Sequence, residues 1–446
     1  MALTWRAVVL AAAGLVPLAL APVPGTVVLW ALLVAAVCAV DYALAASPRQ
    51  VEVRRTVPGS VRLGTPARSE LVLSNRSRRR LRALVRDAWP PSVLADPEAR
   101  GTGAYRSTRH AVDVVPGEST RVRTPLLPHR RGDRDAGPVT IRSFGPLRVA
   151  ARQASIPVPG RLRVLPEFAS RRHLPSRLAR LREMDGRAAV QVRGEGTEFD
   201  SLREYVVGDD VRSIDWRATA RRGDVVVRTW RPERDRRVVI VLDTGRTAAG
   251  RIGASADVTG GTRLEASIEA TLLLAALADR AGDRVHVLAY DRALRGRVAG
   301  ASGTRLLPAL AETLAVVEPA LLETDWRGLV AQVRARVSQR SLVVLLTSLE
   351  PSAIETGLLP VVDQLAGTHQ VVVAAVADEE VAALRAGRES AAEVYDAAAA
   401  SRGDLERAAI AAVLRQRGAE VVEALPDVLA PQLADTYLAL KAAGKL

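Results

Sequence analysis

The chain has 446 residues, a formal net charge of +14 and a single cysteine, Cys38. This length accommodates two soluble domains and a small membrane element. One cysteine excludes an intramolecular disulfide and a cysteine-based zinc site, and it fits a reducing compartment. The charge is uneven, because residues 51–240 hold 40 arginines against 22 acidic residues, a net of +18, whereas residues 241–446 carry a net of −5.

The basic middle of the chain has two interpretations. Phosphate contacts would make it a nucleic-acid-binding region. The arginine blocks Arg78–Arg80 and Arg130–Arg131, however, lack the interleaved aromatic side chains that stack on bases. We therefore expect a solvated or membrane-facing surface, and nucleic-acid binding is the alternative.

Residues 1–48 are predicted to form a transmembrane helical hairpin. Between Arg6 and Asp41 there are 34 consecutive uncharged residues, mostly apolar. A membrane-spanning helix needs about 20 apolar residues, so the run fits two spans, which we place at about 3–22 and 26–46. The prolines and glycine at 22–25 supply the break between them.

A cleaved signal peptide is the alternative interpretation of the first apolar run. Pro22 is a poor residue to follow the cleavage site, and a second apolar run begins at once, so we favour the hairpin. The flanking charges predict that both ends, and hence the soluble body, lie in the cytoplasm. These charges are Arg6 before the hairpin and Arg49, Arg54 and Arg55 after it.

Residues 49–165 are predicted to form a β-sandwich. Short segments of alternating apolar and polar residues are separated by turn sequences such as Pro58–Gly59 and Pro116–Gly117. Several short strands at this spacing are typical of a sandwich. Its simplest role is that of a spacer that holds the next domain away from the membrane.

Residues 237–446 are predicted to form a doubly wound α/β domain. Short apolar runs suit buried parallel strands, and helical patterns separate them. The runs are Val238–Leu242, Arg284–Tyr290, Leu342–Thr347, Gln370–Val376 and Ala419–Glu423. Right-handed crossovers gather the carboxyl ends of such strands along one edge, where ligands bind in this class of sheet.

The segment between these two domains, 166–236, is predicted to be a linker with an unusual mixture of charges and aromatics at 194–230. It contains, in order, G-x-E-F, L-R-E-Y, G-D-D, R-x-I-D-W and T-A-R. This series resembles the signature of the bacterial family called domain of unknown function number 58. We interpret it as a charge-paired joint or a docking face made by Glu198, Phe199, Arg203, Glu204, Tyr205, Gly208, Asp209, Asp210, Arg212, Asp215, Trp216 and Arg221.

Two arrangements of this signature remain open. Tyr205 and Trp216 would pack against the α/β domain while arginine–carboxylate pairs fix the path of the linker. Alternatively, charged side chains such as Arg221 and Asp215 would face outward to a partner.

The α/β domain itself resembles the von Willebrand factor A fold, a Rossmann-type architecture with a metal-ion-dependent adhesion site at the edge of its sheet. In that family the site begins with D-x-S-x-S and is completed by a Thr and an Asp from later loops. Hard oxygen ligands of this kind suit Mg²⁺. The matching positions here are Asp243, Gly245, Thr247, Thr324 with Asp325 beside it, and Ser348.

This candidate metal site is degenerate. Gly245 has no side-chain oxygen, Ser348 stands where the pattern has a carboxylate, and Arg246 adds a positive charge beside the site. We therefore expect no cofactor, and Mg²⁺, held through Asp243 and Thr247, is the alternative. Otherwise these residues would cap helices and close turns on an edge that is retained for protein contact.

No sequence pattern of a common enzyme class is present. There is no P-loop lysine and no G-x-S-x-G elbow, and the lone Cys38 lies in the apolar run. The acidic signature residues leave a metal-dependent hydrolase as an alternative. Arginines are interspersed among them at similar density, however, which favours an ion-paired network.

The sequence thus predicts a multi-domain membrane protein: a transmembrane hairpin, a β-sandwich, the signature segment and a von Willebrand A-like α/β domain. The family resemblance implies an association with MoxR-type AAA+ ATPases. We therefore expect an adaptor or scaffold that binds such an ATPase, with no small-molecule substrate.

Overall fold

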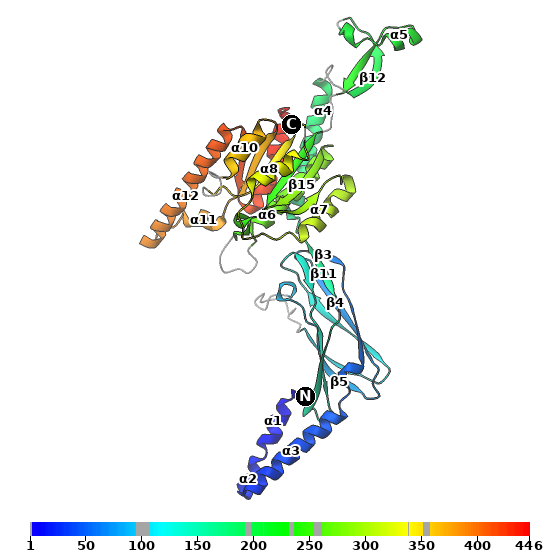
Figure 1. Ribbon diagram of the computed structural model, residues 1–446, viewed down its shortest axis with the longest axis vertical. Coiled ribbons are helices and arrows are strands. Elements are labelled where there is room, and N and C mark those ends of the chain that lie inside the picture. Colours follow the sequence, from blue (N-terminus) through cyan, green and yellow to red (C-terminus); the bar gives the residue numbers. More distant parts are fainter. Residues whose placement is uncertain are drawn as a thin grey trace. The chain divides into compact units, whose positions relative to one another are not determined.

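The chain divides into two compact units, residues 1–167 and 168–446, which are described separately. The computed structural model (Figure 1) describes residues 2–94, 108–191, 198–207, 209–231, 236–252, 261–337, 339–350 and 357–446.

The first unit begins with three helices, α1 (Trp5–Ala12), α2 (Leu15–Leu20) and α3 (Pro24–Leu44). Among the described residues, α3 and the short turn that follows it form the one segment long and apolar enough to cross a membrane, by length and composition. The second predicted helix, 26–46, is therefore confirmed as a long apolar helix.

The first predicted helix, 3–22, differs from the structure. Residues Ala2–Leu3 form strand β1, and the helix that follows is interrupted at Ala13–Gly14. Pro17 accounts for the interruption, because a proline ring clashes with the carbonyl four residues earlier and has no N–H to donate to it. Two short helices result, and the two-span hairpin stays a prediction.

Three sheets make up the rest of the first unit, with strand orders β1-β10-β9-β5-β6, β2-β4-β7 and β3-β11-β8. All pairs are antiparallel except β3 with β11. The strands are β2 (Val51–Thr56), β3 (Ser60–Arg62), β4 (Ala67–Asn75), β5 (Leu81–Arg86), β6 (Arg109–Val114), β7 (Ser119–Leu126), β8 (Gly132–Asp135), β9 (Val139–Phe144), β10 (Ala150–Ile156) and β11 (Arg161–Leu165).

The first two of these sheets pack face to face. Successive side chains of a strand point to opposite faces, and in β4 every second residue is buried, with Leu71 and Leu73 fully enclosed. These leucines share one apolar cluster with Leu81 and Val85 of β5 and Ile141 of β9. The alternation seen in the sequence therefore produces a two-layer arrangement.

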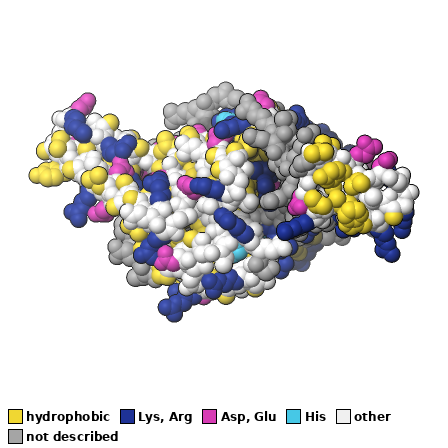
Figure 2. Space-filling view, turned by 90° about the horizontal axis from the view of Figure 1, so that it is seen from above, with side chains coloured by type: hydrophobic (Ala, Val, Ile, Leu, Met, Phe, Trp, Pro, Cys, Tyr) yellow, Lys and Arg dark blue, Asp and Glu magenta, His cyan; other side chains and the backbone are white. Residues whose placement is uncertain are grey.

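Several arginines of these sheets form exposed ion pairs with carboxylates. Arg123 contacts Glu70 at 2.9 Å, Arg80 contacts Asp113 at 2.7 Å, and Arg161 contacts Asp135 at 2.8 Å. Figure 2 views the molecule from above, and on the face that it shows basic side chains stand among acidic and apolar ones. The high arginine content is thus partly neutralised within the sheets.

Asp41, in the last turn of α3, joins this helix to the five-stranded sheet. Its carboxylate is 1% exposed and accepts hydrogen bonds from the backbone N–H groups of Leu147, Val149 and Ala150, each at 2.8 Å. These donors lie in and just after the turn between β9 and β10. Charge-assisted bonds of this kind are about twice as strong as neutral ones, so they fix the end of α3 on this turn.

Gly145 makes this joint possible. A Cβ atom at this position would lie 2.2 Å from both the backbone oxygen and Oδ1 of Asp41. Only glycine allows so close an approach of the two backbones.

The second unit is built on a six-stranded sheet of order β16-β15-β14-β17-β18-β19, parallel except for β16. Its strands are β14 (Arg237–Asp243), β15 (Arg284–Tyr290), β16 (Leu294–Val298), β17 (Leu342–Leu346), β18 (Gln370–Val376) and β19 (Ala419–Ala424). The parallel strands fall on the predicted apolar runs, whereas the hairpin to β16 was not predicted.

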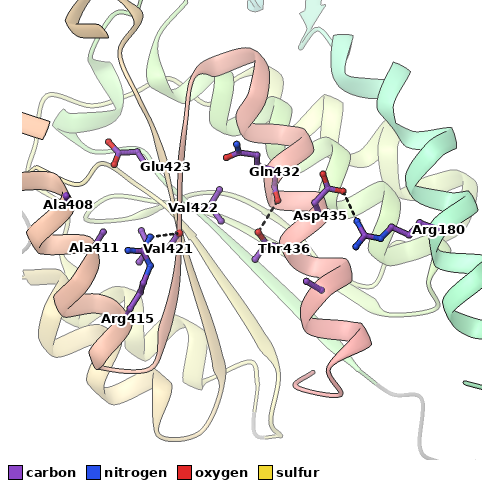
Figure 3. A pocket seen from close by; sticks show the side chains of 11 residues that line it. Arg180, Ala408, Ala411, Arg415, Val421, Val422, Glu423, Gln432, Asp435 and Thr436 are labelled. Carbon is purple, nitrogen blue, oxygen red and sulfur yellow. Dashed lines mark hydrogen bonds and ion pairs between the residues drawn. The ribbon is translucent and has the colours of Figure 1, made fainter. Parts of the chain in front are cut away.

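Helices cover both faces of this sheet. One buried cluster joins it to α6 (Arg263–Arg280), α7 (Leu306–Ala315) and α13 (Pro426–Ala442). The other joins it to α8 (Trp326–Arg334), α10 (Leu359–Ala366) and α12 (Ala391–Gln416). A short helix, α11 (Glu379–Leu384), precedes α12, and the edge strand β19 lies between α12 and α13 (Figure 3).

The segment 166–236 is not simply a linker. It begins with the short helix η3 (Ala169–His173) and α4 (Leu174–Gln191), and Leu181 of α4 is buried in the same cluster as α6 and α13. Apolar residues at helical spacing thus attach its first part to the α/β unit.

The second part of the segment forms a hairpin with a small helical tip, which we call the arm (198–231). Strands β12 (Glu198–Glu204) and β13 (Val226–Arg231) pair antiparallel. The connection carries the short helix η4 (Val211–Ser213) and the helix α5 (Trp216–Arg222). Most of the signature residues therefore belong to one local structure.

We predict that Gly145→Ala disrupts the attachment of α3, because the added methyl group has no space beside Asp41. We expect a loss of about 2 kcal/mol in the free energy of unfolding of the first unit, the usual cost of overpacking. Thermal unfolding of the full chain in detergent measures this. Gly59→Ala is the matched control, since nothing lies within 4 Å of its Cβ position; equal midpoints for the two variants would contradict the account.

Candidate functional site

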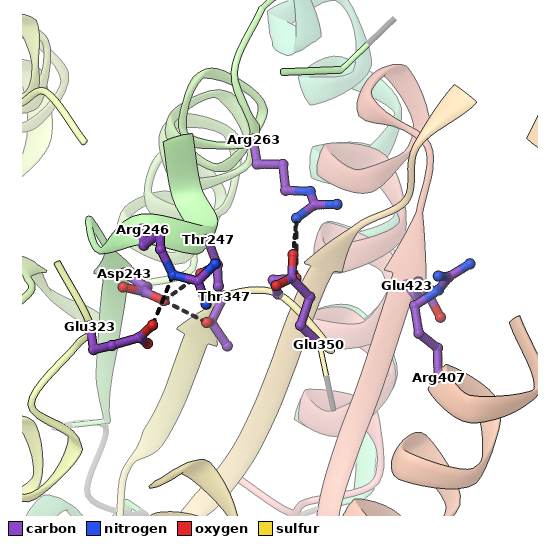
Figure 4. A network of polar contacts seen from close by, with 10 residues as sticks. Asp243, Arg246, Thr247, Arg263, Glu323, Thr347, Glu350, Arg407 and Glu423 are labelled. Carbon is purple, nitrogen blue, oxygen red and sulfur yellow. Dashed lines mark hydrogen bonds and ion pairs between the residues drawn. The ribbon is translucent and has the colours of Figure 1, made fainter. Parts of the chain in front are cut away.

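The carboxylate of Asp243, at the end of the central strand β14, collects donors from three loops (Figure 4). Oδ1 accepts from the N–H of Gly245 at 2.8 Å and from the hydroxyl of Thr324 at 2.5 Å. Oδ2 accepts from the hydroxyls of Thr247 at 3.3 Å and Thr347 at 2.7 Å. The side chain is 4% exposed, so these four bonds replace its hydration. We call these five residues the Asp243 cluster.

The absence of a side chain at Gly245 has a geometric reason. A Cβ atom there would lie 2.2 Å from the hydroxyl oxygen of Thr324 and 2.9 Å from the backbone oxygen of Leu322. The loop that carries Thr324 therefore occupies the space that a serine would need. It is also held by the backbone N–H of Arg246, which donates to Leu322 at 2.8 Å.

The two remaining predicted residues lie apart from the carboxylate of Asp243. Asp325 is the N-cap of α8 and accepts from the N–H of Gly328 at 3.0 Å. Ser348 accepts from Arg263 at 3.4 Å, and Arg263 forms an ion pair with Glu350 at 2.6 Å. The structure thus brings Asp243, Gly245, Thr247 and Thr324 together and gives Asp325 the capping role.

Two residues near this edge were missed by the sequence analysis. Thr347 follows β17 and belongs to the Asp243 cluster. Asp291 follows β15, is fully buried, and accepts from the hydroxyl of Thr244 at 3.2 Å and from Arg295 at 2.6 Å. Both follow parallel strands directly, and this position is the signal that could have identified them.

The charge of Asp291 is stabilised by its surroundings. Burial alone would raise the pKa of its carboxyl, but the guanidinium of Arg295 and the backbone N–H groups of Arg292 and Ala293 lower the pKa below its ordinary value. Asp291 is therefore an ionised anchor for the turn between β15 and β16.

The residues of the Asp243 cluster do not fit Mg²⁺. They supply a single carboxylate, and Ser348 replaces the second expected carboxylate. The space beside Gly245 is filled by Thr324. Within the described ranges, no three His, Cys, Asp or Glu side chains are grouped to hold a metal ion. The Asp243 cluster can hold three loops together, and its side chains do not form a cation-binding site.

In the arm, the acidic signature residues bind donors of the arm itself. Asp209 accepts from Arg203 at 2.5 Å and from the N–H of Val206 at 2.9 Å. Asp210 caps η4 by accepting from the N–H of Arg212 at 2.9 Å. Of these contacts, Arg203 with Asp209 is an ion pair, whereas Asp210 binds a backbone N–H.

Asp215 is the most highly coordinated of these carboxylates. It caps α5 through the N–H groups of Arg217 and Ala218, both at 3.0 Å, and accepts from Arg228 of β13 at 2.8 Å. The N–H of Ala218, followed by Arg228, holds the pKa of this carboxyl below its ordinary value. Asp215 therefore ties α5 to the hairpin.

The aromatic signature residues differ in their surroundings. Trp216, which in one of the two open arrangements would pack against the α/β domain, is 66% exposed. Tyr205 is half-buried, and its N–H donates to Val225 at 2.8 Å. Glu204, Arg212 and Arg221 are exposed. Glu198 and Phe199 lie in β12 with side chains that are not described, and Gly208 lies outside the described residues.

Comparison with known families gives one match. The model of the family described as "Protein of unknown function DUF58" matches residues 201–423, which is half of the chain. The match covers most of the arm and the α/β unit as far as β19. No curated protein matches the chain.

Two solved structures show similarity to about a quarter of the chain each. A PapD-like domain of human CEP192 is 17% identical over 26% of this chain and 85% of its own, with a TM-score of 0.18. The CARDB domain of a Pyrococcus furiosus protein is 14% identical over 24% of this chain and 93% of its own, with a TM-score of 0.16. Scores this low carry no argument about fold or function.

We predict that Gly245→Ser, which makes the loop more like an adhesion-site motif, destabilises the α/β unit and creates no metal site. The serine collides with Thr324, and we expect a loss of about 2 kcal/mol in the free energy of unfolding. Chemical denaturation of the full chain with and without Mg²⁺ measures both effects. Gly367→Ser serves as the control, because the nearest atom to its Cβ position is 3.9 Å away; stabilisation of Gly245→Ser by Mg²⁺ would show that our account of the loop is wrong.

Proposed function

We propose that this chain, which belongs to the DUF58 family of proteins of unknown function, is a membrane-anchored adaptor whose soluble body faces the cytoplasm and binds a MoxR-type AAA+ ATPase. The observation that carries the proposal is the arm, which combines a network of internal ion pairs with exposed apolar side chains.

The membrane part of the proposal rests on α3 and its flanking charges. This helix has 21 residues, of which Asp41 in its last turn is the one charged residue, and its length is sufficient to span a bilayer. Large side chains along it such as Leu29 and Leu32 are exposed. If α1 and α2 with α3 cross the bilayer as the predicted hairpin, both of its ends lie on one side of the membrane. Arg6 before the hairpin and Arg49, Arg54 and Arg55 after it then favour the cytoplasmic side for the soluble body.

The α/β unit supports a binding role for the edge near Asp243. Its strand order, with one antiparallel strand beside β15, and the position of Asp243 after the central strand are in keeping with a von Willebrand A-like domain. The strand order reverses around β14, and binding sites of open α/β sheets lie at such reversals. Because the Asp243 cluster does not fit Mg²⁺, we propose that the edge contacts protein without a bridging cation.

The arm is the proposed docking face. Val206, Val207, Val211 and Trp216 are each more than half exposed, and Val207 is 94% exposed. Exposed apolar groups surrounded by fixed charges are typical of protein interaction sites. The ion pairs of Asp209 and Asp215 hold this surface in shape before a partner arrives, which reduces the ordering cost of binding.

The two alternatives have less support. A metal-dependent hydrolase needs carboxylates directed at a common ion, whereas Asp209, Asp210 and Asp215 accept from donors of the arm. A nucleic-acid-binding surface of the single-stranded kind also needs aromatic side chains that stack on bases, and the arginine blocks Arg78–Arg80 and Arg130–Arg131 lack them.

The test is a crosslinked pull-down of the full chain from native bacterial membranes, with co-purified AAA+ ATPase quantified. We expect enrichment of such an ATPase and a loss of about tenfold with Trp216→Ala, in keeping with the energetics of a central aromatic contact. Tyr395→Ala, which removes an equally exposed aromatic from α12, is the matched control and should retain the partner. Absence of any AAA+ ATPase would overturn the proposed partner, and equal losses in both variants would overturn the docking face.

A further inference from the structure

A groove of about 710 Å³ lies over the edge strand β19 of the α/β sheet (Figure 3). Its floor is formed by Val421, Val422 and Glu423. One wall comes from α12 with Ala408, Ala411 and Arg415, and the other comes from α13 with Gln432, Asp435, Thr436 and Ala439, joined by Arg180 of α4. A volume of this size is within the range of sites that bind ligands.

The groove runs along the open edge of β19. Successive side chains of a strand point to opposite faces, so a groove that touches Val421, Val422 and Glu423 in succession cannot lie over one face alone. Val421 packs with the cluster on the α12 side of the sheet, and Val422 packs with the cluster on the α13 side. Between these two faces lies the edge of the strand.

The backbone of β19 directs hydrogen-bonding groups into this groove. Ala424, on the inner side, accepts from the N–H of Ala377 at the end of β18, whereas the carbonyl of Val421 accepts from the side chain of Arg415 at 3.3 Å. Peptide groups alternate in direction along a strand, so those of Val421 and Glu423 point away from β18. In the described sheet, β18 is the one strand paired with β19.

The walls leave room beside this edge. On α12 the lining residues recur at positions 408, 411 and 415, and on α13 at 432, 435, 436 and 439, so each helix presents one stripe. The small alanine side chains at 408, 411 and 439 leave space in the groove beside the strand. The α12 wall is mainly apolar, and the α13 wall is mainly polar.

We propose that this groove binds an extended segment of a partner polypeptide, which adds to the sheet as a strand beside β19. Main-chain hydrogen bonds to Val421 and Glu423 would give affinity, as in other sheet-edge recognition. Apolar side chains of the segment would face Ala408 and Ala411, and alternate polar ones would face Gln432 and Thr436. The inference deepens the proposed adaptor function by assigning it a second contact surface with a defined binding mode.

Charged side chains line the groove, and one of them, Arg415, covers the edge of β19 with a hydrogen bond that a ligand can replace. Exposed edge strands are usually protected by charges against unwanted pairing. The guanidinium of Arg415 covers the carbonyl of Val421 with a single hydrogen bond of 3.3 Å. Asp435 and Glu423 are held more closely, by Arg177 at 2.8 Å and by Arg407 at 3.0 Å. The bond of Arg415 is long and exposed, so an incoming backbone would replace it at little cost while the two ion pairs stay in place.

The experiment is a selection of random nine-residue peptides against the full chain in detergent micelles, followed by affinity measurement on the selected sequences. We expect alternating apolar and polar sequences whose affinity falls at least tenfold when every second residue is N-methylated, because a methyl group removes the N–H that pairs with β19. Ala408→Arg should weaken binding by at least tenfold by filling the wall. Ala409→Arg, an equally exposed alanine of α12 outside the groove, should leave it unchanged.

A second variant tests the strand edge itself. Val421→Pro removes an outward-directed N–H and adds bulk at the edge without removing a bond to β18, so it should abolish peptide binding while the sheet unfolds at a similar temperature. Failure to select any peptide, or selected peptides that bind the Ala408→Arg and Val421→Pro variants equally well, would overturn the proposal. So would a dimer in sedimentation that Val421→Pro converts to a monomer, since the occupant would then be a second copy.

These outcomes are separate from those of the pull-down. Loss of groove binding leaves the ATPase contact through the arm intact, and absence of an ATPase leaves peptide binding at β19 intact.

Discussion

The arrangement of the loops at the edge of the α/β sheet depends on the hydrogen bonds that the carboxylate of Asp243 accepts. It ends the central strand of the sheet and receives hydrogen bonds from residues 245 and 247, from Thr324 and from Thr347. Three loops that are far apart in sequence are thereby fixed around one buried charge. Removing that charge would leave buried hydroxyls without acceptors, a larger cost than the hydrogen bonds themselves contribute.

Aspartates that accept several hydrogen bonds anchor two other parts of the chain in the same way. Asp41 fixes the end of α3 by accepting three backbone N–H groups, and Asp215 fixes α5 in the arm by accepting two and pairing with Arg228. In each case an aspartate replaces contacts that an apolar core would otherwise have to provide. This explains how acidic residues that resemble catalytic groups in the sequence serve as anchors in the structure.

Much of the fold could be predicted from the sequence, because it follows from periodicity. The parallel strands lie on apolar runs, and Thr247 is only four residues from Asp243 in the sequence. Thr324 lies in the loop between α7 and α8, and its place beside Asp243 was expected from the resemblance to the adhesion-site pattern rather than from periodicity. The features that could not be predicted depend on close contacts between distant residues. The hydroxyl of Thr347 donates to Asp243, and Thr324 occupies the space beside Gly245. In the first unit, the backbone at Gly145 lies directly against Asp41. Local patterns do not encode such distances. The interruption at Ala13–Gly14 could have been anticipated from Pro17, whereas the exposure of Trp216 could not.

The central claim is that the loops at the edge around Asp243 are held together by hydrogen bonds to its carboxylate and need no cation. Calorimetric titration of Mg²⁺ and Mn²⁺ into the full chain tests it most directly. The account predicts no saturable heat at millimolar concentrations of either ion. Saturable binding at millimolar or tighter affinity, abolished by Asp243→Ala in a variant that remains folded, would contradict it.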